Sequence, residues 1–208
     1  MRLTILLTTI VSSIILTSCI KHEIIPAPER KATLKAYFNG TINSTNLEFT
    51  ENVNGYYGKT SKFQSIFPGG QTSSAVYFFE MKSTQTNSSI QVGLGSIFWD
   101  AGVSAGPSLS TFNTFFNNKT LPSYSDNGTN GFTVIYKDVY GNAWTSKQNS
   151  VNSQNVLFSN VNQESDPNGD YSKFNCSFSC YVYRSYGNPS VTDSLYIQNA
   201  QLKGWFSR

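Results

Sequence analysis

The feature that most constrains the fold is a two-residue alternation of apolar and polar side chains, which recurs in short runs along most of the chain. In residues 174–182, every second side chain is a Phe, Cys or Val, and the others are Asn, Ser or Tyr. Successive side chains of a β-strand point to opposite faces of its sheet. The alternation therefore predicts strands with one face in a core and the other face in water.

Clusters of turn residues separate these runs, and the two features together predict the fold class. Aromatic residues make up 14% of the chain and charged residues only 13%, and aromatic rings suit a half-buried pleated surface. We therefore expect an all-β fold, an antiparallel β-sandwich or a partly closed barrel, with one short helix. The turn clusters lie at residues 39–40, 68–70, 126–128, 141–142, 166–170 and 187–189.

Residues 108–118 form the one segment with a helical period. Four apolar side chains recur there at helical spacing, and Ser108 or Ser110 can cap the first turn. We expect two turns of helix that plug one end of a sheet. An aromatic ridge that faces a ligand is the alternative, but aromatic stripes at this spacing usually pack in a core. The four side chains are Leu109, Phe112, Phe115 and Phe116.

The strand pattern also predicts two local features, a β-hairpin and a bulge or turn. The alternating residues 132–136 lead through Gly141-Asn142 to Trp144, which predicts a β-hairpin around the Gly-Asn pair. In residues 195–206, the inward-facing positions switch parity along the segment. A one-residue slip moves every side chain to the other face, so we expect a bulge or a turn near Asn199-Ala200.

The two cysteines in the body of the chain, Cys176 and Cys180, lie four residues apart in the same alternating run. At about 3.3 Å per residue, their Cα atoms would be roughly 13 Å apart, beyond the disulfide range of about 4.4–6.8 Å. Both point to the same face as the neighbouring Phe side chains. We therefore interpret them as small buried apolar residues.

The N-terminus has the features of a secretory signal peptide. Residues 3–16 are apolar apart from Thr and Ser, Arg2 supplies a positive flank, and the run is shorter than the 20 or so residues that span a membrane. The sequence Leu16-Thr17-Ser18-Cys19 resembles the lipobox of bacterial lipoproteins. That resemblance implies a signal peptide at 1–18 and a lipid on Cys19, which becomes the first mature residue. An ordinary signal peptide with an incidental cysteine is the alternative.

Cleavage there would leave 190 residues (208 − 18), enough for one domain with a substantial core. Residues 19–32 contain Pro26 and Pro28 and no strand pattern, so we expect a lipidated tether followed by a single β-sandwich domain at 33–208. Outside the tether there is no cluster of Lys and Arg, and so no footprint for nucleic acid.

Three further segments resemble small, mostly uncharacterised outer-membrane lipoproteins of the Bacteroidetes, which have an all-β domain. These segments are Phe38-Asn39-Gly40 and residues 136–144 and 197–206. The resemblance implies a membrane-anchored β protein and carries no catalytic residue. Related surface-exported lipoproteins have an acidic run after the lipidated cysteine, whereas only Glu23 occurs here, so either face of the outer membrane stays open. Asp193-Ser194-Leu195 is similar to an O-glycosylation signal of that phylum.

Few residues are available for catalysis or for metal binding. The only histidine is His22 in the tether, which removes histidine-based triads and metal sites from the domain. Asp166, Asn168 and Asp170 have calcium-loop spacing, but Gly169 comes two positions too early, so turn chemistry explains them better. We expect no catalytic residues, metal or cofactor. A glycosidase pair among Glu48, Glu51, Glu80, Asp100, Asp138 and Glu164 stays open.

The remaining candidates are aromatic. Trp99, Trp144, Trp205 and Tyr140 lie beside turns or polar residues, where exposed rings could stack on sugars. The alternative is that they pack on sheet edges or in the core. The sequence favours a non-enzymatic, lipid-anchored lipoprotein with a structural or interaction role. A carbohydrate-binding accessory lipoprotein is the second hypothesis, so the partner would be a protein or a glycan.

Overall fold

The computed structural model describes residues 29–208 except residues 68, 149–153 and 188–190. The expected signal peptide, Cys19 and most of the expected tether lie outside the described residues. The described chain contains ten strands, the helix α2 (Leu109–Asn118) and the short 3₁₀ turn η1 (Asp126–Gly128). The strands are β1 (Tyr37–Ile42), β2 (Thr45–Thr50), β3 (Tyr56–Ser65), β4 (Thr72–Ser83), β5 (Ser89–Asp100), β6 (Phe132–Lys137), β7 (Ala143–Ser146), β8 (Asn155–Asp166), β9 (Gly169–Tyr186) and β10 (Val191–Ser207).

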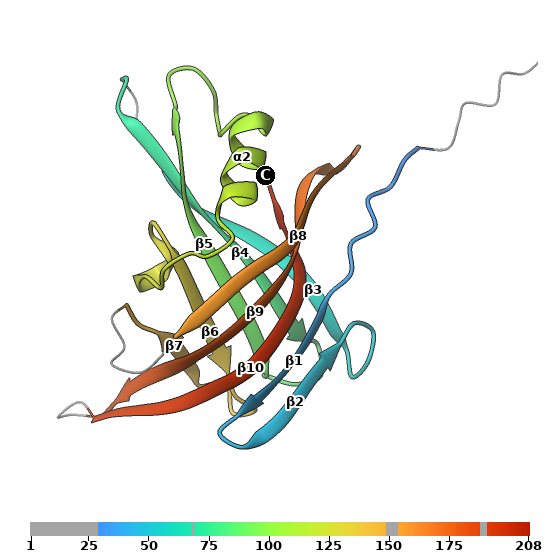
Figure 1. Cartoon of the computed structure of the whole chain (residues 1–208), viewed down its shortest axis with the longest axis vertical. Coiled ribbons are helices and arrows are strands. Elements are labelled where there is room, and N and C mark those ends of the chain that lie inside the picture. The colour runs from blue at the N-terminus through green and yellow to red at the C-terminus, as the bar shows by residue number, and fades with distance from the viewer. Residues whose placement is uncertain (1–28, 68, 149–153, 188–190) are drawn as a thin grey trace, which may run out of the picture.

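All ten strands belong to one antiparallel sheet, which curls into a half-barrel (Figure 1). The order across the sheet is β2-β1-β10-β9-β7-β6-β5-β4-β3, and β8 pairs with β9 beside β7. The predicted all-β antiparallel fold with one short helix is therefore confirmed. Of the two layouts that the sequence left open, the structure has the partly closed barrel, because β9 and β10 continue unbroken along the curved sheet.

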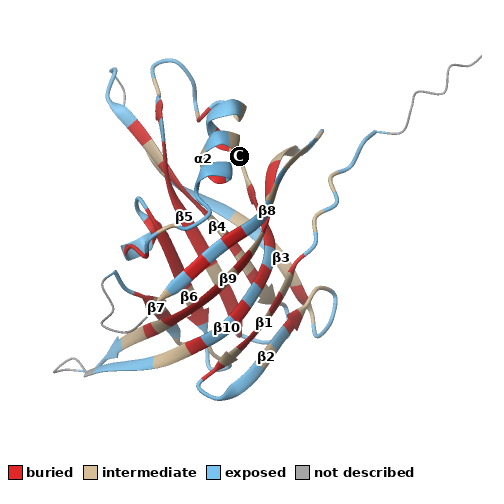
Figure 2. Ribbon diagram, in the orientation of Figure 1, coloured by how far each residue is buried: buried red, intermediate tan, exposed pale blue. Residues whose placement is uncertain are grey.

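The concave side of the sheet holds the core, and the alternation seen in the sequence decides which side chains enter it. Figure 2 shows buried residues alternating with exposed ones in the first part of β8 and with partly buried ones along β9. Aromatic rings fill much of the core, and Phe206 stacks on Phe116 and on Phe174 with ring centroids 4.7 Å and 4.6 Å away. Stacked and edge-on rings add to the stability that burial alone provides.

Helix α2 covers the core between β5 and β8 and so confirms the predicted plug (Figure 1). Ser108 is its N-cap, and the Ser108 side chain accepts a hydrogen bond from the backbone N–H of Thr111. Phe112 and Phe116 are buried, and both pack edge-on against Tyr77 of β4. The aromatic stripe is therefore part of the core.

The predicted hairpin and the predicted bulge are both present. Lys137 pairs with Ala143 at the end of the β6–β7 hairpin. The pairing of β9 with β10 shifts register between Ile197 and Ala200, where Asn199 adopts a φ of 53°. Asparagine tolerates this left-handed conformation better than most residues, which lets a bulge form there while β10 continues.

The two cysteines of β9 are buried and unpaired, as their spacing predicted. Burial raises the pKa of the Cys180 thiol to about 12 and raises the pKa of the Cys176 thiol well above its ordinary range. A thiol that stays protonated and inaccessible is a poor nucleophile. Both cysteines therefore act as core residues.

Candidate functional site

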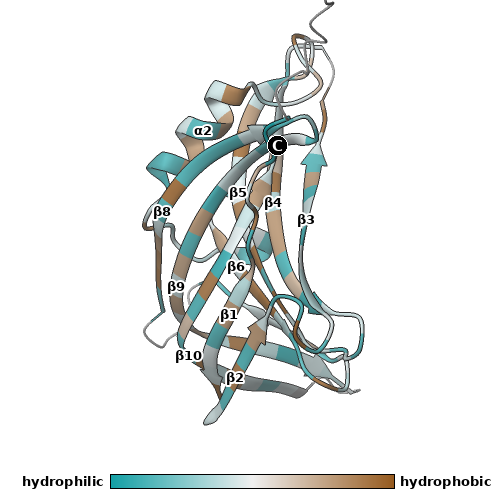
Figure 3. Ribbon diagram, turned by 90° about the vertical axis from the view of Figure 1, so that its right-hand side faces the viewer, coloured by the Kyte–Doolittle hydropathy of each residue, from teal (hydrophilic) through white to brown (hydrophobic). Residues whose placement is uncertain are grey.

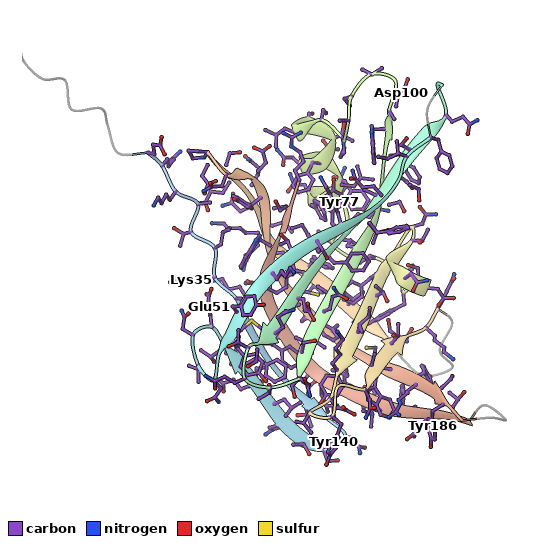
Figure 4. The ribbon with its side chains drawn as sticks, turned by 180° about the vertical axis from the view of Figure 1, so that it is seen from behind. Lys35, Glu51, Tyr77, Asp100, Tyr140 and Tyr186 are labelled. Carbon is purple, nitrogen blue, oxygen red and sulfur yellow. The ribbon has the colours of Figure 1, made fainter. Side chains whose placement is uncertain are left out.

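The three tryptophans do not present the open ring faces that stacking on a sugar requires. Their relative exposures are 8% for Trp99, 6% for Trp144 and 9% for Trp205, whereas Tyr140 is 84% exposed. Figure 4 places Tyr140 at one end of the molecule and Asp100, the neighbour of Trp99, at the opposite end. The four predicted rings therefore do not form one surface, and Tyr140 alone is available for stacking.

Trp144 is held in place by the turn that joins β6 and β7. Asp138 Oδ2 accepts hydrogen bonds from Trp144 Nε1 at 3.2 Å and from Asn142 Nδ2 at 2.9 Å. Its Oδ1 accepts the backbone N–H groups of Tyr140 and Asn142, each at 2.9 Å. Burial by itself would raise the pKa of Asp138, but these hydrogen bonds outweigh it and hold the pKa below its ordinary value of 3.8.

We expect Asp138→Ala to lower the free energy of unfolding by about 2 kcal/mol at pH 7, because it leaves the Trp144 N–H without its partner. A depressed native pKa stabilises the fold at pH values above the ordinary value of 3.8. The difference between the variant and the native protein should therefore shrink as the pH falls through the lowered pKa. Urea unfolding of both proteins at several pH values measures this difference in the free energy of unfolding.

The control is Asp100→Ala, which removes a turn carboxylate that accepts a hydrogen bond from the backbone of Gly102 in an exposed loop. Asp100→Ala should lower the free energy of unfolding at pH 7 by less than half as much as Asp138→Ala does. Equal losses in the two variants, or a difference that does not change with pH, would contradict the role assigned to Asp138.

The other candidate carboxylates also have structural partners. Asp166 accepts the N–H of Ala32, which lowers its pKa, and also accepts the N–H groups of Asn168 and Gly169 in the β8–β9 turn. Asp170 bonds to Ser165 and forms an ion pair with Arg208, with Nη2 and Oδ2 2.6 Å apart. Within the described residues, no three His, Cys, Asp or Glu side chains are grouped so as to hold a metal ion.

The six carboxylates proposed for a glycosidase pair come from separate segments, and hydrogen bonds hold each of them. Glu48 bonds to Thr50 and Glu80 to Ser89 within the sheet, while Asp138 and Asp100 hold turns. Glu51 accepts the N–H of Ala36. Glu164 accepts the N–H of Thr33 at 3.0 Å and Lys173 Nζ at 2.8 Å, and so fastens the N-terminal segment to β8.

The site that the sequence reasoning missed is a polar groove on the outer face of β8, β9 and β10, which run side by side in Figure 3. It has a volume of about 490 Å³, and we call it the Lys–Asn groove. Its polar lining combines three lysines, three asparagines and a threonine from four separate segments. These are Lys35 and Thr33 before β1, Asn160 and Asn162 of β8, Lys173 and Asn175 of β9, and Lys203 of β10.

The strand register explains why these side chains meet. Lys203 lies opposite Asn175 on β9, and Asn162 of β8 lies opposite Lys173. The register of β8 against β9 shifts between Ser159 and Asn162, where Asn160 has a φ of 51°. The alternation in the sequence indicates that each lysine points outward. It does not indicate which strands pair, and this pairing is what brings the lysines together.

A second exposed surface lies at one end of β3, β4 and β5. Phe63 of β3 is 67% exposed and Phe98 of β5 is 50% exposed, and Ile66 and Phe67 in the β3–β4 connection are also exposed. Phe63 pairs with Val76 and Phe98 with Ser74, so both rings lie on the outer face of the sheet. We call these four side chains the outer apolar cluster.

Comparison of the chain with protein-family models, with curated proteins and with solved structures finds no match. Among the described residues, no helix has the length and apolar character needed to cross a membrane. The case for a function therefore rests on the geometry of the two surfaces and on the sequence of the N-terminus.

Proposed function

We propose that this chain is a non-enzymatic lipoprotein that is anchored to the outer membrane by a lipid on Cys19 and binds a partner through the outside of its sheet. The observation that carries the proposal is the outer apolar cluster. Because the concave side of the sheet is occupied by its own buried side chains, partners would contact the outer face or the loops. The N-terminal lipobox supports the anchor, for either face of the outer membrane.

The cluster has the chemistry of a protein-binding surface. Grouped aromatic and aliphatic side chains are costly to expose to water, and such groups often mark protein interfaces. Phe63 and Phe98 project from strands of the sheet, so little order would be lost when a partner covers them. A protein with an apolar contact surface is the partner that suits this cluster.

The anchor is tested by Cys19→Ser, because the lipid attaches through the thiol. We expect the variant to leave the membrane fraction or to retain its signal peptide. Cys176→Ser, which changes a buried thiol in β9, should leave membrane fractionation unchanged. Wild-type processing and membrane association of Cys19→Ser would rule out the lipoprotein assignment.

The interaction role is tested by placing a photo-crosslinking amino acid at Phe63 or Phe98 in living cells. Tyr140 and Leu157, exposed by 84% and 45%, serve as control positions away from the cluster. We expect one defined adduct from the cluster positions and none from the controls. The adduct formed at Phe98 should disappear with Phe63→Ser. Identical adducts from all four positions would refute the binding role of the cluster.

Carbohydrate binding is the second candidate, and the Lys–Asn groove is the observation that favours it. Stacking by Trp99, Trp144 or Trp205 is not available, because each ring is at least nine-tenths buried. The amide groups along the groove can donate to and accept from sugar hydroxyls. A glycan would therefore be bound mainly by hydrogen bonds.

A further inference from the structure

We propose that the Lys–Asn groove binds an acidic saccharide, a sugar chain that carries carboxylate or sulfate groups. The inference rests on the carbohydrate-binding function proposed above and names the class of glycan. It follows from the donors that line the groove, from the strands that position them and from the groove's size.

The charge in the groove is positive and partly unused. Three lysines line the groove and no acidic residue does, while Glu164 beside the groove forms an ion pair with one of the lysines. Glu164 pairs with Lys173 at 2.8 Å. Lys35 and Lys203 are exposed, and neither forms an ion pair within the described part of the chain. Two ammonium groups therefore remain available for anionic groups of a ligand.

The asparagines select among acidic ligands. A lysine ammonium is a donor only, whereas an asparagine side chain is both a donor and an acceptor. Asn160, Asn162 and Asn175 can therefore bond to hydroxyl groups while Lys35 and Lys203 bond to oxyanions. A saccharide that carries both kinds of group matches this set better than an acidic peptide, which offers few hydroxyls.

The lining also makes nucleic acid a poor fit. Phe174 is the aromatic residue among the lining residues, and its ring belongs to the core, with 3% of the residue exposed. Single-stranded nucleic acids usually need exposed rings on which the bases stack. A groove of about 490 Å³ falls within the usual range for small-molecule sites and suits a short stretch of an oligosaccharide.

The scaffold under these side chains is ordered. Lys203, Lys173 and Asn175 lie on the two longest strands of the sheet, which pair with each other over most of their length. The segment that carries Lys35 is held on both sides of that residue. Thr33 N–H bonds to Glu164 and Ala36 N–H bonds to Glu51, which lies beside Lys35 in Figure 4.

The test is titration calorimetry of the purified mature chain with four probes at low ionic strength. The probes are tetragalacturonate, a heparin-derived tetrasaccharide, neutral maltotetraose and a tetraglutamate peptide. We expect at least tenfold tighter binding of one acidic saccharide than of maltotetraose or tetraglutamate. Lys35→Gln with Lys203→Gln should weaken that binding at least tenfold. The matched control, Lys62→Gln with Lys137→Gln, removes the same charge from exposed lysines outside the groove and should change it less than twofold.

The possible outcomes separate this inference from the function on which it rests. Equal binding of acidic and neutral saccharides would keep the carbohydrate function and overturn the acidic specificity. Tetraglutamate binding as tight as either acidic saccharide would overturn the saccharide assignment, as would equal losses in the two double variants. Absence of binding by all four probes would overturn both proposals. The thermal midpoints of the variants check that each chain is folded.

Discussion

Replacing Trp205 with alanine is expected to lower the free energy of unfolding by about 3–5 kcal/mol, the usual cost of removing a buried aromatic ring. β1 pairs with β10 only as far as Lys203, so beyond that point the edge of β10 is no longer covered by β1. There, the Trp205 ring packs on Phe79 of β4 with centroids 5.1 Å apart and lies against Gly58 of β3. Its loss would open the seam where the two sides of the half-barrel meet.

A double-mutant cycle with Gly58 tests that seam directly. A Cβ at Gly58 would lie 2.6 Å from the Trp205 ring and 2.9 Å from the Phe79 ring, so Gly58→Ala alone should be destabilising. When Trp205 is already alanine, the larger clash is gone and the same substitution should cost clearly less. Urea denaturation of the four proteins measures this coupling. Additive effects would show that the ring does not close the seam.

Replacing Phe116 with alanine is expected to be about as costly, again about 3–5 kcal/mol, and should also loosen helix α2. Phe116 stacks on Phe206 and packs edge-on against Phe112 and Tyr77, so it joins the helix to β10 and β4. A ten-residue helix is marginal without such tertiary contacts. Amide hydrogen exchange should therefore accelerate more across residues 109–118 of the helix than in the strands of the sheet.

Phe115→Ala is the matched control, because Phe115 is the same residue type on the same helix but is only partly buried. We expect it to cost less than half as much as Phe116→Ala and to leave the exchange of the helix slow. Similar losses from both substitutions would contradict the assignment of Phe116 as the residue that anchors the helix.

The local patterns of the sequence were sufficient to predict the elements. Alternation over residues 174–182 placed Cys176 and Cys180 on the inward face of β9, where the structure has them. The spacing of Phe112 and Phe116 predicted α2, and the parity switch near Asn199 predicted the bulge in β10. Each prediction depends on residues that lie close together in the chain, and the geometry of the local backbone alone relates their side chains.

Local patterns were not sufficient to predict which rings are exposed or which polar groups meet. Trp144 and Trp205 lie beside turns and polar residues, yet both are buried, because Asp138 holds the first and the seam with β3 covers the second. Lys35 and Lys203 are 168 positions apart (203 − 35) and line one groove only because β1 pairs with β10, where Tyr37 lies opposite Lys203. The sequence by itself therefore determined the faces of the strands and the place of the helix. The tertiary structure decided the seam, the burial of the tryptophans and the Lys–Asn groove, because these depend on strand pairings between residues that are distant in the chain.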